Sequence, residues 1–379
     1  MSLRTARRMD GVERTLIRQV FDAAPRDAIN LGLGQPDLKT PPRICLAGIE
    51  GIALGKTSYT ATAGDRAVRA AVAKRYAPFV SGPESVLITI GSQEAVFAVA
   101  LTLVDSGDEI LYPDPGYPGY PVVARLVGAQ GISYPLRAER RFRLDAADVV
   151  ARLTRKTRLV IVCSPSNPTG AVDRANDLEQ LARELRARGV AWLSDEIYAG
   201  FAYDGPIPSL RAFSPEGGLV VAGLSKDLSM TGWRIGWAVG PAPIVERVIA
   251  AHQYLVTSAS SVSQAAALAA LAPESDAERQ AYLEVFRHRR DLMAEGLSKI
   301  PGIEFHIPEG AFYFFVDISR FGPSIEVCRR ILERRNVITI PGVAFGPGGE
   351  GYMRISYAAS DDDIVRGIEA LRAELATRP

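Results

Sequence analysis

The segment "SKDLSMTGWRIGW", residues 225–237, follows the apolar run "GLVVAGL" at residues 218–224 and contains two basic residues that need an explanation. It places Lys226 and Arg234 among residues whose composition is typical of a protein interior. Lysine and arginine are rarely buried unless they are paired or serve a site. We therefore expect the two cations to belong to a binding site at the end of a buried strand.

The composition restricts the classes of protein and partner to be considered. Hydrophobic residues make up 47% of the 379 residues, as in globular proteins, and the length favours about two domains. The 44 Lys and Arg residues are balanced by 43 Asp and Glu residues. Because this balance gives no general attraction to nucleic acid or to an anionic membrane, we expect neither as a partner.

The cysteines, the histidines and the N-terminus bear on metal binding and location. Cys45, Cys163 and Cys328 stand far apart, as do the three histidines, and none shows the spacing of metal ligands. No run reaches the roughly 18 apolar residues of a membrane span. The N-terminal "MSLRTARRMDG" lacks the apolar core of a secretory signal. We expect a reduced, cytoplasmic protein without a metal site.

Short apolar runs alternate with helical patterns between residues 86 and 240. The runs are "VLITIG" (86–91), "EILYPD" (109–114), "RLVIVCSP" (158–165), "VAWLSDE" (190–196), "GLVVAGLSK" (218–226) and "RIGWAVG" (234–240). Such strands, separated by helices, predict an α/β domain with a mainly parallel sheet covered on both faces. Ligands of these sheets bind beyond the carboxyl ends of the strands, so the polar residues there are candidates for one site.

The alternation of apolar runs and helical patterns ends near residue 275. A long amphipathic helix over residues 274–300 precedes strand-like pieces and a last helix at 362–376. The pieces are "AFYFFVDI" (311–318), "VITIPG" (337–342) and "GYMRISYA" (351–358). We predict a large α/β domain over 38–275, and a smaller α+β domain formed by 1–37 and 276–379 that closes over the site.

Lys226 and Arg234 suggest a particular chemistry. A buried lysine loses its proton readily and can form a Schiff base with a carbonyl group. The guanidinium of Arg234 offers a fork of donors that suits a phosphate group. Taken singly, each has a plainer explanation, a strand-end charge that reaches solvent for Lys226 and a structural ion pair for Arg234.

Six motifs in order resemble the fold type I pyridoxal-phosphate aminotransferases of class I/II, the aspartate aminotransferase-like class. They are "LGLGQPD" (31–37), "DPGYPGY" (114–120), "SPSNPTG" (164–170), "LSDEIYAGFAYDG" (193–205), "SKDLSMTGWRIGW" and "GYMRISYA". The resemblance extends over nearly the whole chain. It implies a sheet of the seven-stranded type and pyridoxal 5'-phosphate as the cofactor. The implied reaction transfers an amino group from an L-amino acid to a 2-oxo acid.

The resemblance also implies roles for residues around the cofactor ring. Lys226 would form the Schiff base and then move the proton of the substrate Cα atom. Asp195 would face the pyridine nitrogen and keep it protonated. Tyr198 and Asn167 would bind the phenolic oxygen, and Tyr117 would stack on the ring.

Further residues are implied at the phosphate and at the substrate. The phosphate would lie at Ser92 and Gln93, at a helix N-terminus, and against Ser225 and Arg234. Tyr59 would reach in from the neighbouring subunit of a homodimer. The substrate carboxylate would bind Arg354, with Gly34 and Asn167 beside it.

Two other functions, and the identity of the amino donor, stay open at this point. A C–S β-lyase would use the same cofactor and the same lysine. A cofactor-binding transcriptional regulator would need a DNA-binding domain, and only about 30 residues precede "LGLGQPD". Gln93 stands where close aspartate-specific members of the family carry a lysine, so uncharged amino donors are at least as plausible as aspartate.

Overall fold

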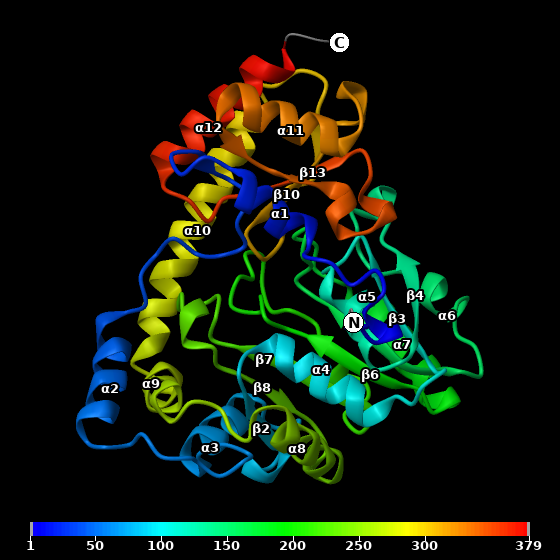
Figure 1. Ribbon diagram of the computed structural model, residues 1–379, viewed down its shortest axis with the longest axis vertical. Coiled ribbons are helices and arrows are strands. Elements are labelled where there is room, and N and C mark those ends of the chain that lie inside the picture. Colours follow the sequence, from blue (N-terminus) through cyan, green and yellow to red (C-terminus); the bar gives the residue numbers. More distant parts are fainter. Residues whose placement is uncertain (1–2, 377–379) are drawn as a thin grey trace.

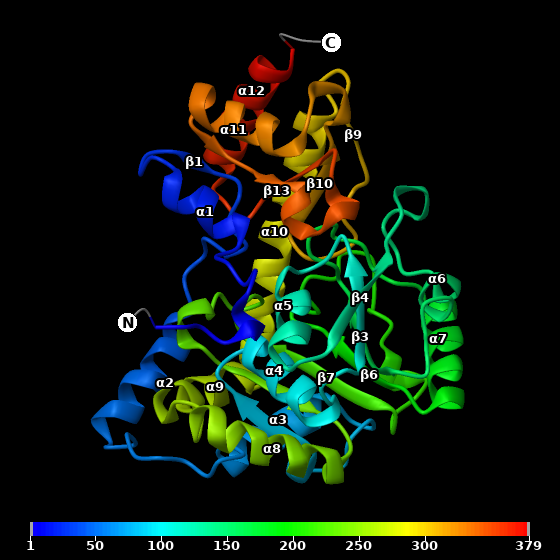
Figure 2. The ribbon, with the colours of Figure 1, turned by 45° about the vertical axis from the view of Figure 1, so that its right-hand side comes forward.

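The computed structural model describes residues 3–376, which form a seven-stranded sheet, a four-stranded sheet and a two-stranded parallel pair, flanked by helices (Figure 1). The larger sheet lies in the lower half of Figure 1 and the smaller sheet in the upper half. Helix α10 (Ser275–Leu297) runs beside both of them (Figures 1 and 2). The long helix predicted over residues 274–300 is thus the element that joins the two halves.

The larger sheet has seven strands in the order β2-β8-β7-β6-β5-β3-β4. Their bounds are β2 Val86–Thr89, β3 Glu109–Asp114, β4 Gln130–Pro135, β5 Thr157–Cys163, β6 Ala191–Asp195, β7 Gly218–Gly223 and β8 Gly236–Val239. Neighbouring strands are parallel except that β8 is antiparallel to both β2 and β7. The prediction of a mainly parallel α/β sheet is confirmed. Strand β4 was not predicted, because it lies at the sheet edge with half of its residues exposed and no continuous apolar run.

Helices cover both faces of this sheet, which explains why its strands are apolar throughout. On one face lie α4 (Ser92–Leu103), α5 (Gly119–Leu126) and α8 (Ala242–Val256). On the other face lie α3 (Arg66–Arg75), α6 (Ala146–Val150), α7 (Ala175–Arg188) and α9 (Ser261–Leu271). In β5, for example, Ile161 packs in the first layer and the neighbouring Val160 and Val162 in the second.

The reversed strand β8 places Arg234 beside Lys226. Gly236, the first residue of β8, pairs with Gly223 at the end of β7 and with Thr89 at the end of β2. The residues just before β8 therefore lie at the edge of the sheet where β2 and β7 end. This topology brings the two cations of the segment 225–237 to the same edge as the N-terminus of α4.

The smaller part of the fold is the predicted α+β structure. Its four-stranded antiparallel sheet has the order β12 (Ile340–Pro341), β13 (Tyr352–Ser356), β10 (Tyr313–Asp317) and β9 (Glu304–Phe305). A parallel pair joins β1 (Ile29–Asn30) to β11 (Val337–Ile338). Helices α11 (Ser324–Arg335) and α12 (Asp361–Leu375) pack with these strands, and α1 (Leu16–Ala23) and α2 (Pro42–Ala53) precede the larger sheet.

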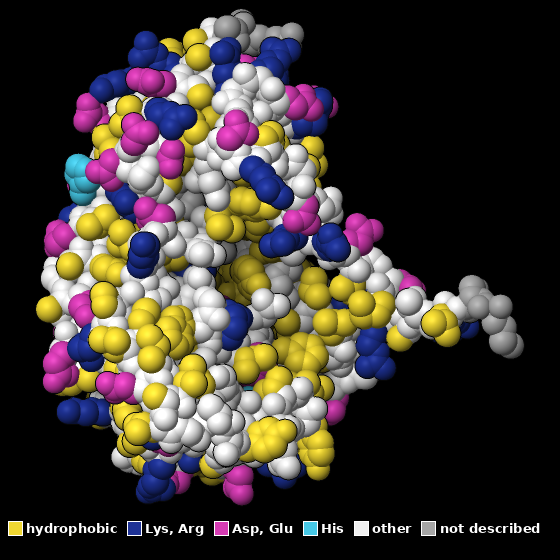
Figure 3. Space-filling view, turned by 60° about the vertical axis from the view of Figure 1, so that its left-hand side comes forward, with side chains coloured by type: hydrophobic (Ala, Val, Ile, Leu, Met, Phe, Trp, Pro, Cys, Tyr) yellow, Lys and Arg dark blue, Asp and Glu magenta, His cyan; other side chains and the backbone are white. Residues whose placement is uncertain are grey.

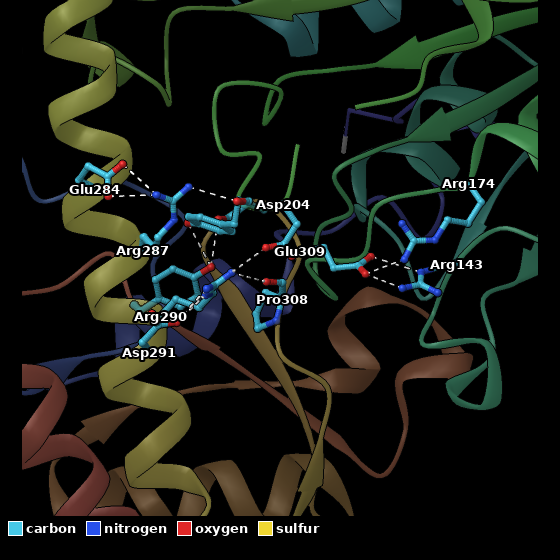
Figure 4. A network of polar contacts seen from close by, with 12 residues as sticks. Arg143, Arg174, Asp204, Glu284, Arg287, Arg290, Asp291, Pro308 and Glu309 are labelled. Atoms are coloured by element: carbon cyan, nitrogen blue, oxygen red, sulfur yellow. Dashed lines mark hydrogen bonds and ion pairs between the residues drawn. The ribbon is translucent and has the colours of Figure 1, made fainter. Parts of the chain in front are cut away.

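Ion pairs join the two parts of the chain. Arg143 and Arg174 point toward Glu309 in Figure 4, and the Arg174 guanidinium lies 2.8 Å from the carboxylate. On the other side, Nε of Arg279 on α10 donates a hydrogen bond of 2.9 Å to the carboxylate of Asp227 in the larger part. That residues 38–275 form one domain and the remainder a second, closing domain stays a prediction. Within residues 3–376, no helix is both long enough and apolar enough to cross a membrane.

Candidate active site

A cavity of about 270 Å³ lies at the carboxyl edge of the larger sheet. Ten of the predicted site residues line it: Gly34, Ser92, Gln93, Tyr117, Asn167, Asp195, Tyr198, Ser225, Lys226 and Arg234. These residues come from six separate segments of the chain, and the ends of the strands bring them together. Tyr120, Cys163 and Ile197 also line the cavity and were not predicted.

The segment around Lys226 separates its apolar and polar side chains. Leu224, Leu228 and Met230 are fully buried in the core of the larger sheet, while Lys226 turns into the cavity. The next residue, Asp227, accepts a hydrogen bond of 2.9 Å from Nε of Arg279 on α10, which fixes the turn. The cation among the apolar residues is therefore held in place by the packing of its neighbours.

The environment of Lys226 favours a neutral amine. Its Nζ atom donates a hydrogen bond of 2.5 Å to the carbonyl oxygen of Gly34. Burial, followed by the charges of Arg354 and Arg234, lowers the pKa of Lys226 to about 8, against the opposing effect of Asp195. At pH 7 about a tenth of an amine with such a pKa is unprotonated, against less than about a thousandth of an ordinary lysine. The unprotonated form is the one that a nucleophile or general base requires.

Asp195 ends β6 as a buried carboxylate without a basic partner. One oxygen accepts a hydrogen bond of 2.9 Å from the Tyr120 hydroxyl, and the other accepts one of 3.2 Å from the backbone N–H of Ile197. No ion pair involves Asp195 within residues 3–376, and burial raises its pKa to about 6. A cationic group in the cavity would stabilise the ionised form of Asp195. Tyr120 lies on the first turn of α5, three residues after Tyr117, and its nearness in sequence to that predicted site residue was the available sign.

The opposite end of the cavity suits an anion. Ser92 begins α4, so the unpaired N–H groups of its first turn and the helix dipole favour negative charge. Gly91 has φ +108°, and a Cβ atom there would lie 2.8 Å from Nη2 of Arg234. Arg234 itself has no carboxylate partner within residues 3–376 and donates to the carbonyl oxygen of Thr231 at 3.0 Å. We call these groups, together with Ser225, the anion cradle.

Arg354 is a buried cation without a carboxylate partner in the described part of the chain. Its guanidinium donates to Oδ1 of Asn167 at 2.9 Å and to the carbonyl oxygen of Gly32 at 2.6 Å, and Nε has no partner among the described residues. The rings of Tyr313 and Phe345 enclose it at 4.3 and 4.7 Å from their centroids. Arg354 does not itself line the cavity, but Asn167 does. A buried charge in this state favours binding of an anionic ligand.

Three predicted aromatic residues occupy different environments. The Tyr198 hydroxyl lies 2.8 Å from that of Tyr313. Tyr117 donates to Oε1 of Gln93 at 3.2 Å, and its ring meets Tyr120 edge-on. Tyr59, in contrast, is 87% exposed and lies outside the cavity of its own chain. Its contribution from a neighbouring subunit stays a prediction.

Comparison with known proteins yields matches along nearly the whole chain. Residues 26–371 match the family model described as aminotransferase class I and II. The chain is 33% identical over 373 residues to the aspartate aminotransferase of Pyrococcus horikoshii, covering 96% of this chain and 95% of that protein. A probable N-acetyl-LL-diaminopimelate aminotransferase of Bacillus subtilis is 38% identical over 354 residues, covering 92% and 89%. The structure of Thermus thermophilus aspartate aminotransferase with maleate has a TM-score of 0.93 at 31% identity, covering 99% and 100%.

Replacement of Asp195 by asparagine is expected to stabilise the cofactor-free protein at pH 8. Since the folded-state pKa of about 6 lies above the ordinary value of 3.8, the ionised carboxylate costs about 2–3 kcal/mol of folding free energy above pH 6. Asparagine removes that cost. The difference in unfolding free energy between Asp195→Asn and wild type should therefore fall toward zero as the pH decreases from about 6 to about 4.

Denaturant titrations over this pH range measure the difference. Asp10→Asn, at an exposed position, is the control and should change the unfolding free energy by less than about 0.5 kcal/mol. If Asp195→Asn is as stable as wild type or less stable at pH 8, burial of the ionised carboxylate does not destabilise the folded protein.

Proposed function

Because the chain belongs to the class I and II aminotransferase family, and is therefore an aminotransferase, we propose that it uses pyridoxal 5'-phosphate. The proposed reaction transfers an amino group from an L-amino acid to a 2-oxo acid. One observation carries the proposal: a single cavity combines a lysine whose pKa is lowered to about 8, a buried carboxylate that forms no ion pair within residues 3–376, and an anion cradle.

The groups around the cavity fit this cofactor. Asp195 would hold the protonated ring nitrogen, since a cation there relieves the cost of its burial. The phosphate would occupy the cradle described above, formed by the start of α4 with Ser225 and Arg234. Lys226 would attach the cofactor as a Schiff base. When bound, the cofactor supplies an electron sink for negative charge that develops at the substrate Cα atom.

Three further side chains would position the cofactor ring. Tyr198 and Asn167, which both line the cavity, would donate hydrogen bonds to its phenolic oxygen. Tyr117 would lie against one face of the ring. Gln93 would add a backbone N–H group at the phosphate, because it is the second residue of α4.

Arg354 would bind the substrate, and Lys226 would transfer its proton. The guanidinium of Arg354 would bind the α-carboxylate through two hydrogen bonds, with Asn167 and the backbone of Gly34 beside it. Lys226 would accept the proton from the substrate Cα atom and later return it at another carbon, which its lowered pKa favours. The burial of Arg354 would exclude water from the carboxylate, and the proposed closing domain, which contains Arg354, would complete this enclosure.

The lining of the cavity favours uncharged amino donors. Lys226 and Arg234 are the basic residues among the described residues that line it, and both have roles in the proposed reaction. Gln93 provides an amide where a cation would be needed for the distal carboxylate of aspartate. The two curated relatives described above are named for different donors, so the family alone does not determine the donor. We propose that aliphatic or aromatic amino acids react at least as well as aspartate.

We also propose that the enzyme is a homodimer in the cytoplasm. Helix α2 exposes Leu46, Ile49 and Ile52, each more than half exposed, and the loop after it exposes Tyr59. The face in Figure 3 carries many hydrophobic side chains around a central hollow. A second copy of the chain would cover the apolar residues of α2 and bring its Tyr59 toward this subunit's anion cradle. The three free cysteines agree with a reducing compartment.

Absorption spectra and turnover test the cofactor and the role of Lys226. Protein loaded with pyridoxal phosphate is expected to absorb visible light and to lose that band when an amino donor is added. Lys226→Ala should bind the cofactor but lose at least about a hundredfold in turnover, since it removes the general base. Lys156→Ala, at an exposed lysine, should behave as wild type.

Two outcomes would contradict this proposal. One is near-normal turnover by Lys226→Ala. The other is release of pyruvate and ammonia from cysteine or cystathionine without a 2-oxo acid, which would identify a C–S β-lyase instead.

A panel of amino donors tests the choice of substrate. With 2-oxoglutarate as acceptor, kcat/KM for leucine or phenylalanine is expected to equal or exceed that for aspartate, because the described lining of the cavity offers no cation beyond Lys226 and Arg234. Gln93→Lys should raise kcat/KM for aspartate relative to phenylalanine by roughly tenfold or more, since a charged hydrogen bond contributes about 1.5–3 kcal/mol. Exclusive use of aspartate by the wild type would overturn this part of the proposal.

The molar mass in solution tests the dimer. Light scattering should give about twice the chain mass of 40.9 kDa. Ile49→Glu combined with Ile52→Glu should raise the dimer dissociation constant at least about a hundredfold, because it buries unpaired charges in the proposed interface. Val365→Glu, an exposed apolar residue on α12, serves as the control. A wild-type monomer at micromolar concentration would refute the dimer.

A further inference from the structure

We infer that Tyr313 is a positioning residue that orients the Tyr198 hydroxyl and supports the Arg354 guanidinium, so that one side chain links the cofactor end of the site to its carboxylate end. The inference rests on the proposed function and adds a residue that was not among the predicted site residues. Tyr313 lies on β10 and is fully buried. It does not line the cavity, so any effect on chemistry must pass through the residues that it contacts.

The first contact concerns the direction of the hydrogen bond between two hydroxyl groups. The hydroxyl oxygens of Tyr313 and Tyr198 lie 2.8 Å apart, and either could donate. A phenol has one proton to donate. If Tyr198 donates to the phenolic oxygen of a bound cofactor, its own oxygen must accept the proton of Tyr313. The pair is then a chain of two hydrogen bonds that both point toward the cavity.

The second contact involves the ring of Tyr313 and not its hydroxyl. The guanidinium carbon of Arg354 lies 4.3 Å from the ring centroid, within the range of a cation–π interaction. Phe345 covers the same guanidinium at 4.7 Å. Because Arg354 is buried without a carboxylate partner in residues 3–376, these rings and its two hydrogen bonds hold the charge ready for a substrate carboxylate.

The third contact explains the glycine at position 34. A Cβ atom on Gly34 would lie 2.4 Å from the Tyr313 hydroxyl oxygen but 3.5 Å from the ring carbon that bears it. Only the hydroxyl therefore excludes a side chain there. Since the carbonyl oxygen of Gly34 accepts the hydrogen bond of Lys226, Tyr313 also borders the backbone that holds the reactive amine.

These contacts predict separate effects for the hydroxyl and the ring. Donation by Tyr313 strengthens Tyr198 as a donor, because hydrogen bonds in a chain polarise one another. A weaker Tyr198 donor would leave more negative charge on the cofactor oxygen. The nitrogen that joins Lys226 to the cofactor would then hold its proton more tightly, and the visible band of the loaded enzyme would titrate at a higher pH.

The test compares Tyr313→Phe, Tyr198→Phe and wild type as cofactor-loaded enzymes. Tyr313→Phe is expected to raise the pH midpoint of the visible band by roughly half a unit to one unit, as the loss of one neutral hydrogen bond predicts. Tyr198→Phe should raise it further. The dissociation constant of 3-phenylpropionate, a carboxylate without an amino group, should change less than about twofold in Tyr313→Phe because the ring remains.

Two further variants separate the ring from general disruption of the core. Tyr313→Leu should weaken 3-phenylpropionate binding by about tenfold or more, because it removes the cation–π contact. Tyr357→Phe is the matched control, since it removes a buried hydroxyl that contacts Tyr203 and Ala311 instead of Tyr198. It should leave both the midpoint and the dissociation constant at their wild-type values.

A measurement without cofactor tests the packing. Gly34→Ala should lower the denaturation midpoint of the cofactor-free protein, and Tyr313→Phe in the same chain should restore most of the loss, since the remaining contact is an ordinary 3.5 Å.

The possible failures can be told apart. A wild type without a donor-sensitive visible band would refute the proposed function. A wild type with that band, together with an unchanged midpoint in Tyr313→Phe and no rescue of Gly34→Ala, would overturn the role of Tyr313.

Discussion

The site depends on one constraint, which is the burial of positive charge at the carboxyl edge of the larger sheet. Lys226 lies near Arg234 and Arg354, and burial together with these two charges lowers its pKa to about 8. Asp195 is the acidic residue among the described residues that line the cavity. It is one carboxylate beside the three cations, so it does not neutralise them fully. The folded chain thus holds charges whose partners would be the groups of a cofactor and a substrate.

The topology explains how this arrangement is built without a continuous charged surface. Parallel strands end in apolar layers on both faces, and only the loops beyond them carry polar groups. The reversal of β8 adds Arg234 to the edge at which β7 delivers Lys226. Arg354 comes from the second sheet, where β13 pairs with β10 and places it beside the ring of Tyr313. Ion pairs such as that of Arg279 on α10 with Asp227, the residue after Lys226, join the two parts of the fold, so the two halves of the site share a framework.

Local signals in the sequence predicted which strand ends carry the site residues better than they predicted the contacts between side chains. Lys226, Asp195 and Asn167 follow apolar strands directly, and the order of the strands alone brings such residues to one edge. Tyr120 and Tyr313 were missed because their partners, Asp195 and Tyr198, lie 75 and 115 residues away. The direction of β8 was not predictable, because an apolar run does not show whether its strand is parallel or antiparallel to its neighbours. The edge strand β4 was not predictable either, because it is half exposed and contains no apolar run. The role of Tyr59 depends on a second subunit and cannot be decided from one chain.

The most direct test of the central claim is the ionisation of Lys226 in the cofactor-free protein. The rate of acylation at Lys226, followed by mass spectrometry of the peptide that contains it, measures the fraction of neutral amine at each pH. The account predicts a midpoint near pH 8. A midpoint near the ordinary lysine value of 10.5 would contradict it, because Lys226 would then be a solvated amine and not the desolvated base that the proposed chemistry requires.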